Sequence, residues 1–120
     1  MSAIHELAPE VWGEYFDAVG RELDGAEISI EIAEAEGPPR REATRLALQA
    51  ITYDRRDDVF VVSAARGGPR LPTVLRHLVD HPERITVDSN TLLAPMMIAV
   101  EGGDGARTVI RIEREPEFGG

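Results

Sequence analysis

The sequence predicts an α+β fold, with an N-terminal helix packed on a curved antiparallel sheet of about six strands that could close into a partial barrel. The first observation is a change of periodicity at Gly25. Before it, apolar side chains recur at helical spacing: Trp12, Phe16, Val19 and Leu23. After it, isoleucines alternate with polar residues, as in a half-buried strand: Ile28, Ile30 and Ile32. The second observation is that most of the remaining chain has the character of strands separated by turns.

The helix has clear start and stop signals. Pro9 suits the first helical position, where its missing N–H group costs nothing. Leu7 and Trp12 are spaced to form a hydrophobic staple across that start. Gly25 suits the left-handed conformation that often ends a helix. We therefore expect one amphipathic helix, with its wide apolar stripe on a sheet face.

Turn residues divide the rest of the chain into expected strands. Gly37-Pro38-Pro39, the polar run of residues 54–58, Gly67-Gly68-Pro69 and the glycine-rich residues 102–105 all mark breaks. Residues 44–53 fit a helix as well as a strand, and the β-branched and aromatic residues near 51–53 favour the strand. The expected strands cover residues 26–34, 44–53, 59–62, 85–87, 96–100 and 108–112.

Residues 71–81 stay ambiguous on periodicity. Leu71, Val74, Leu75, Leu78 and Val79 fit one face of a short helix. An extended conformation, with Leu75, His77 and Val79 on one face, is also allowed.

Four segments resemble a known family: the helix motif Trp12-x-x-x-Phe16-Asp17, the strand Ile28-Ser29-Ile30-Glu31, residues 77–88 and the closing hairpin that ends in Val109-Ile110-Arg111-Ile112. Together they resemble the uncharacterised bacterial family called domain of unknown function 5335. The resemblance implies a helix followed by an antiparallel sheet, and it favours extended structure around His77. It transfers no catalytic or binding residue to this chain.

Composition limits the classes of function. The 120 residues fit one domain, residues 1–120, with a short flexible tail from about residue 115. There is no cysteine, and the net charge of −9 disfavours binding to nucleic acids or to anionic membranes. No run of apolar residues is long enough to span a bilayer, and the N-terminus does not resemble a signal peptide. We expect a cytoplasmic protein without a cofactor.

His77 and His81 are the only pair with metal-ligand spacing. On a helix the two imidazoles would share a face, with Asp80 or Glu83 as a third ligand. On a strand they would lie about 13 Å apart, too far for one ion. No metal site is therefore assigned, and His77 and His81 are kept as candidates.

The sequence favours a non-enzymatic binding or protein-interaction domain with a protein or small-molecule partner. Its contact surface would be the groove between helix and sheet or an exposed strand edge. One alternative is a metal- or acid/base-dependent enzyme that uses His77 and His81. Another is a carrier protein activated at Gly119-Gly120, since a terminal diglycine is the chemical handle of sulfur carriers. The sequence leaves a monomer and a homodimer both open.

Overall fold

The computed structural model describes residues 3–89 and 95–114. Its helical part consists of the 3-10 turn η1 (Pro9–Val11) and the helix α1 (Trp12–Glu22). The described residues also form eight strands: β1 (Ala3–Glu6), β2 (Glu27–Ala33), β3 (Arg40–Asp54), β4 (Val59–Ala65), β5 (Thr73–Asp80), β6 (Pro82–Ser89), β7 (Pro95–Gly102) and β8 (Arg107–Arg114).

All eight strands form one antiparallel sheet in the order β1-β6-β7-β8-β2-β3-β4-β5. The α+β class and the antiparallel sheet are confirmed, but six strands is an undercount. β1 was missed because four residues are too few to show a period, and β5 lies in the segment that periodicity left open. The sheet is also not closed into a barrel, because β1 and β5 each pair with a single neighbour.

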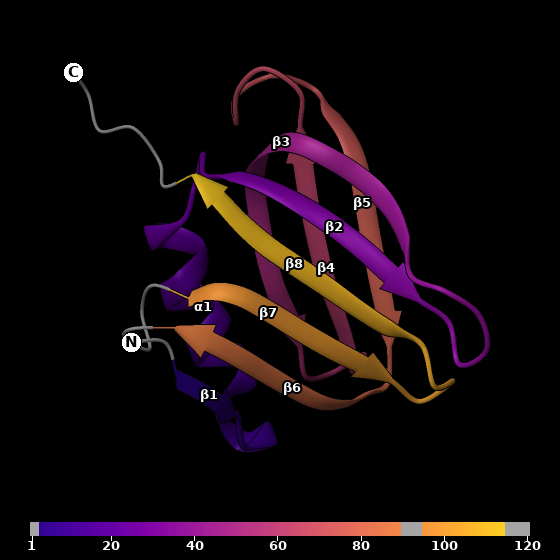
Figure 1. The fold of residues 1–120 in the computed structure, drawn as a ribbon. Helices are drawn as coiled ribbons and strands as arrows, with labels where there is room; N and C mark the ends of the chain where they lie inside the picture. Colours follow the sequence, from indigo (N-terminus) through magenta and orange to yellow (C-terminus); the bar gives the residue numbers. More distant parts are fainter. Residues whose placement is uncertain (1–2, 90–94, 115–120) are drawn as a thin grey trace.

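The sheet folds over into two layers. Figure 1 shows β2, β8, β7 and β6 crossing in front of β3, β4 and β5. β3 belongs to both layers, because its first half pairs with β2 as far as Ala47 and its second half pairs with β4. Arg45, at φ 56°, and register shifts in both ladders mark the bend. At the other end, the single residue His81, at φ 50°, links β5 to β6.

α1 fills one open side between the layers. It contacts β3 more than it contacts any other strand, and its Phe16 and Val19 side chains are fully buried. The start and the end of the helix agree with the sequence: the Trp12 Nε1–H donates to the Leu7 carbonyl oxygen at 3.1 Å, and Gly25 has φ 87°. The apolar stripe therefore packs in the core formed by both layers. The strands contribute mainly these residues to the core: Ile28, Ile30, Leu46, Leu48, Ile51, Phe60, Val62, Ile85, Val87, Ile98, Val100 and Ile110.

Both ambiguous segments are strands, so extended structure around residues 44–53 and His77 is confirmed. The closing hairpin is also confirmed, with β7 and β8 joined by the glycine-rich turn. No helix in the described part of the chain is long and apolar enough to cross a membrane. The cytoplasmic location stays a prediction.

Candidate functional site

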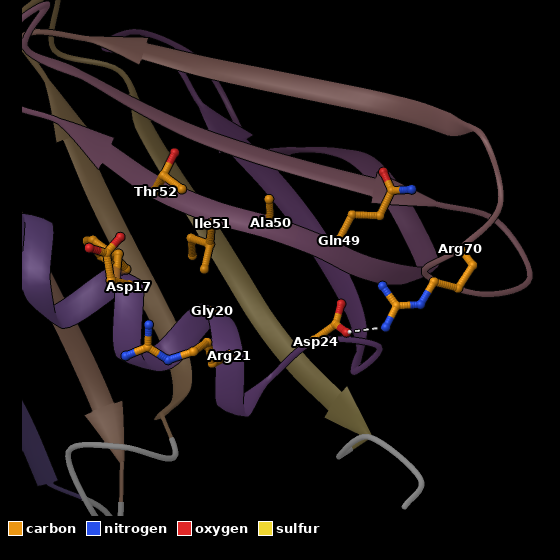
Figure 2. Close-up of a pocket in the computed structure, with 10 residues that line it drawn as sticks. Asp17, Gly20, Arg21, Asp24, Gln49, Ala50, Ile51, Thr52 and Arg70 are labelled. Atoms are coloured by element: carbon orange, nitrogen blue, oxygen red, sulfur yellow. Dashed lines mark ion pairs between the residues drawn. The ribbon is translucent and has the colours of Figure 1, made fainter. Parts of the chain in front are cut away.

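The first candidate site is a groove of about 440 Å³ between α1 and β3. Figure 2 shows Asp17, Gly20 and Arg21 of α1 on one side and residues 49–52 of β3 on the other. The floor is apolar, because Phe16 and Ile51 are buried beneath it. The volume is in the range of small-molecule sites in proteins.

The groove exists because this edge of β3 has no strand partner among the described residues. Beyond Ala47, β3 pairs with β4 alone, so the opposite edge of β3 lies against the helix. Gly20 permits this close approach: a Cβ atom on Gly20 would lie 3.3 Å from the Ile51 carbonyl oxygen. α1 therefore covers the backbone groups at this edge of β3, so a ligand in the groove would contact side chains.

Charged side chains of both signs line the rim. Arg70 Nη2 lies 3.7 Å from Asp24 Oδ2, at one end of the groove (Figure 2). By contrast, Asp17 and Arg21 make no ion pair with any residue in the described ranges. Within the described part of the chain, the rim thus offers to a ligand one carboxylate and one guanidinium that have no ion-pair partner.

Gln49 fixes the loop that carries Arg70. Its side-chain Nε2 donates to the carbonyl oxygens of Pro69 and Leu71, at 3.1 and 2.8 Å, and its Oε1 accepts from the Thr73 hydroxyl at 2.6 Å. These hydrogen bonds hold the β4–β5 connection beside the groove. Arg70 is therefore positioned by the loop as well as by its exposed ion pair with Asp24.

A second candidate site lies at the end of β5, where two adjoining hollows of about 440 and 640 Å³ share Ile32, His77, Asp104 and Ala106. We call this pair of hollows the β5 cleft. His77 is half-buried in it, and its Nε2 shares a 3.0 Å hydrogen bond with the hydroxyl of the buried Thr108. Burial lowers the pKa of His77, against an opposing effect of Glu42, so its imidazole favours the neutral form.

Asp58 connects the β3–β4 turn to the β5–β6 corner. Its Oδ1 accepts the Tyr53 hydroxyl at 2.6 Å, and its Oδ2 lies 3.1 Å from His81 Nδ1. Its backbone oxygen accepts the His81 N–H at 2.8 Å. Both Asp58 and His81 have positive φ, at 52° and 50°. The Tyr53 and His81 hydrogen bonds lower the pKa of Asp58, so its carboxylate stays charged at neutral pH.

Comparison with known proteins gives a family. The model described as "Family of unknown function (DUF5335)" matches residues 3–118. The chain belongs to this family. The resemblance found in the sequence motifs is thereby confirmed.

The family carries no activity that could be transferred to this chain. One relative, described as an uncharacterized protein of Aquifex aeolicus (strain VF5), is 26% identical over 111 residues, which are 92% of this chain and 93% of the relative. No solved structure gives a significant match. The function of this DUF5335 member has to be argued from its own geometry.

The two histidines singled out in the sequence have different partners. His77 points to Thr108 on β8, whereas His81 bonds Asp58 in the β3–β4 turn. Among the described residues, no group of three His, Cys, Asp or Glu side chains could hold a metal ion. The candidate Gly119-Gly120 handle lies outside the described residues.

Sequence reasoning did not find the α1–β3 groove residues. The expectation named a groove between helix and sheet, but no side chain in it. One signal was present: Gly13 and Gly20 are seven residues apart and lie on one face of a helix. Glycines on one helix face indicate a close approach to a neighbouring backbone, which here is β3.

The Asp58 contact gives a testable alkaline titration. The hydrogen bond to Asp58 is the main cause that raises the pKa of Tyr53 to about 12, and burial raises the pKa of Tyr15 to about 12. We expect no tyrosine of the native protein to ionise near 10, as followed by ultraviolet absorbance. In Asp58→Asn the Tyr53 midpoint should fall and that of Tyr15 should stay. Asn tolerates the positive φ of residue 58. Two unchanged midpoints would contradict the contact.

The burial of His77 predicts acid sensitivity. Because its folded-state pKa is lowered from 6.5, the unfolded chain takes up the proton first. Its contribution to the free energy of unfolding is therefore complete above pH 6.5 and is lost as the pH falls toward the lower folded-state pKa. We expect His77→Gln to flatten this part of the pH profile measured by denaturant unfolding. Equal profiles for the native chain and His77→Gln would refute the assignment.

Proposed function

We propose that this DUF5335 member is a non-enzymatic binding domain whose α1–β3 groove holds a small molecule with one cationic and one anionic group. The observation that carries the proposal is the pair of free charges on the rim, Asp17 and Arg21, above an apolar floor. The Asp17 carboxylate would accept from an ammonium group, and the Arg21 guanidinium would donate to a carboxylate. An aliphatic or aromatic portion would lie on Phe16 and Ile51.

The charges support a ligand of mixed sign. The groove is lined by two acidic and two basic side chains, although the whole chain has a net charge of −9. An anion alone would meet Asp17 and Asp24, and a cation alone would meet Arg21 and Arg70. A zwitterion avoids both repulsions, and its desolvated charges find partners on the rim.

The test is a titration with the twenty free amino acids, together with their N-acetyl and amide derivatives, followed by amide chemical shifts in the NMR spectrum. We expect an apolar zwitterion to shift the amides of Gly20, Arg21 and Ile51. Its derivatives with one charge blocked should bind at least about tenfold more weakly. Arg21→Ala and Asp17→Ala should each abolish the shifts.

The matched control is Arg76→Ala, which removes an exposed arginine on β5, outside the groove. It should leave the titration unchanged. If no zwitterion shifts the groove amides, or if the groove variants bind like the native chain, the proposal is wrong.

A second function, an acid/base-dependent enzyme, is favoured by one observation, the contact of Asp58 with His81. Asp58 Oδ2, at 3.1 Å from His81 Nδ1, would orient the imidazole so that Nε2 is directed away from this contact and is available for proton exchange. His81 also lines the β5 cleft. Cleavage of p-nitrophenyl acetate offers a test: His81→Gln should lower the rate and His77→Gln should not. Equal rates in both variants would remove this candidate.

A further inference from the structure

The second open side between the two layers is bordered by β5. α1 covers the first open side along β3, whereas β5 pairs only with β4. β5 also contains no proline, one of the residues that commonly protect strand edges, and its charged residues are Arg76 and Asp80. Its whole second edge is therefore without a strand partner in the described structure.

The hydrogen bond from the His81 N–H to the Asp58 carbonyl shows which backbone groups of β5 face this edge. Hydrogen-bonded pairs alternate along an antiparallel ladder. Asp58 and His81 are thus a hydrogen-bonded pair, and the next such pairs in the register are Phe60–Val79 and Val62–His77. The backbone N–H and C=O groups of the odd-numbered residues of β5 therefore face β4. The N–H and C=O groups of Arg76 and Leu78 thus point to the free edge.

The free edge ends at Asp80. A Cβ atom on Gly102 of β7 would lie 3.8 Å from the Asp80 carbonyl oxygen and 3.1 Å from Val79 Cγ1. An added strand therefore has access to Val74, Arg76 and Leu78 but not to the end of β5. Val74 and Leu78 are 57% and 46% exposed, which leaves apolar surface on the outer face for alternate side chains of that strand.

The β5 cleft, which begins at the same edge, is mainly acidic. The residues that line it include four acidic residues and one arginine: Glu34, Glu36, Asp80, Asp104 and Arg40. Arg40 already lies 3.4 Å from Glu34 and 3.7 Å from Glu42. Arg40 and Glu34 therefore offset each other, and the remaining acidic residues of the lining favour a cationic occupant.

We propose that the free edge of β5 adds an extended peptide segment of a partner protein, with basic side chains at every second position. Main-chain hydrogen bonds to Arg76 and Leu78 would give the peptide its orientation. Successive side chains of a strand point to opposite faces, so the basic set would enter the β5 cleft and the other set would lie on Val74 and Leu78.

The charge of the β5 cleft favours a basic peptide over a second copy of this protein or its own C-terminal residues. A second copy of this protein would bring a net charge of −9 to an acidic cleft, and residues 115–120 contain two glutamates and no basic residue. Both are repelled, whereas a basic segment is attracted. This site lies apart from the α1–β3 groove, so neither proposal depends on the other.

The probe is a fluorescein-labelled, capped heptapeptide in which arginine and valine alternate, measured by fluorescence anisotropy with the full chain. We expect it to bind and a glutamate–valine peptide of the same length not to bind. Only one set of alternating peptide amides faces β5, so N-methylation of the arginine amides or of the valine amides should weaken binding about tenfold in one case only. Equal effects of both methylations, or no binding, would overturn the proposal.

Variants locate the site. Glu36→Arg should weaken binding of the arginine–valine peptide about tenfold, and the matched reversal Asp17→Arg in the α1–β3 groove should change it less than about twofold. Amide hydrogen exchange provides a measurement independent of charge: the peptide should slow exchange at Arg76 and Leu78 and leave the exchange rate of Gly20 unchanged. Equal losses in both variants, or slower exchange at Gly20 instead, would show that net charge or the groove explains binding, and the proposal would fail.

Discussion

Phe16→Ala should lower the free energy of unfolding by about 3–5 kcal/mol, the largest effect expected of any single substitution considered for this chain. Phe16 is fully buried, with its ring edge-on to Tyr15 and Phe60 at centroid distances of 5.2 Å. Its contact with Phe60 connects α1 to β4, in the layer formed by β3, β4 and β5. Truncation leaves a cavity between helix and sheet that neither can fill by small movements. Equilibrium denaturation in urea measures the loss.

The matched control is Ile4→Ala. Ile4 is 73% exposed on the edge strand β1, so its truncation removes little contact and should change stability by less than about 0.5 kcal/mol. A loss below about 1 kcal/mol for Phe16→Ala would mean that α1 does not pack on the sheet as described. The groove proposal would fall with that result, since Phe16 forms part of the groove floor.

The fold could be predicted from the sequence where side chains on one face repeat. Ile28 and Ile30 are fully buried as their alternation indicates, and Trp12, Phe16 and Val19 form the buried stripe of α1. Turn chemistry was equally informative, because Pro38, Pro39 and the glycines of residues 102–105 can end strands for local reasons. These features depend on neighbours along the chain.

Features that depend on distant residues could not be predicted. Ser29 alternates as an outward residue but is 4% exposed, and its hydroxyl donates to Glu113 on β8 at 2.7 Å. The partner of Ser29 is set by the sheet order, which the sequence does not specify. In the same way, Asp58 and His81 meet because β3, β4 and β5 are adjacent. Neither the Asp58 contacts nor the rim of the α1–β3 groove has a local sequence pattern.

Gly20→Val should lower the free energy of unfolding by about 1–3 kcal/mol, because the branched side chain has to enter the contact between α1 and the β3 backbone. A Cβ atom alone would lie 3.3 Å from the Ile51 oxygen and 3.5 Å from Ile51 Cγ2. The helix would have to move away, which also alters the floor of the groove.

Gly13→Ala is the matched control. Its Cβ atom would lie 3.9 Å from the Tyr53 carbonyl oxygen, which is an ordinary contact. The greater helix propensity of alanine should therefore stabilise the chain by about 0.5–1 kcal/mol. Urea denaturation of both variants decides the matter. Opposite signs support α1 as the cover of the open β3 edge, whereas equal stabilisation would show that Gly20 does not face the strand and that the groove has a different shape.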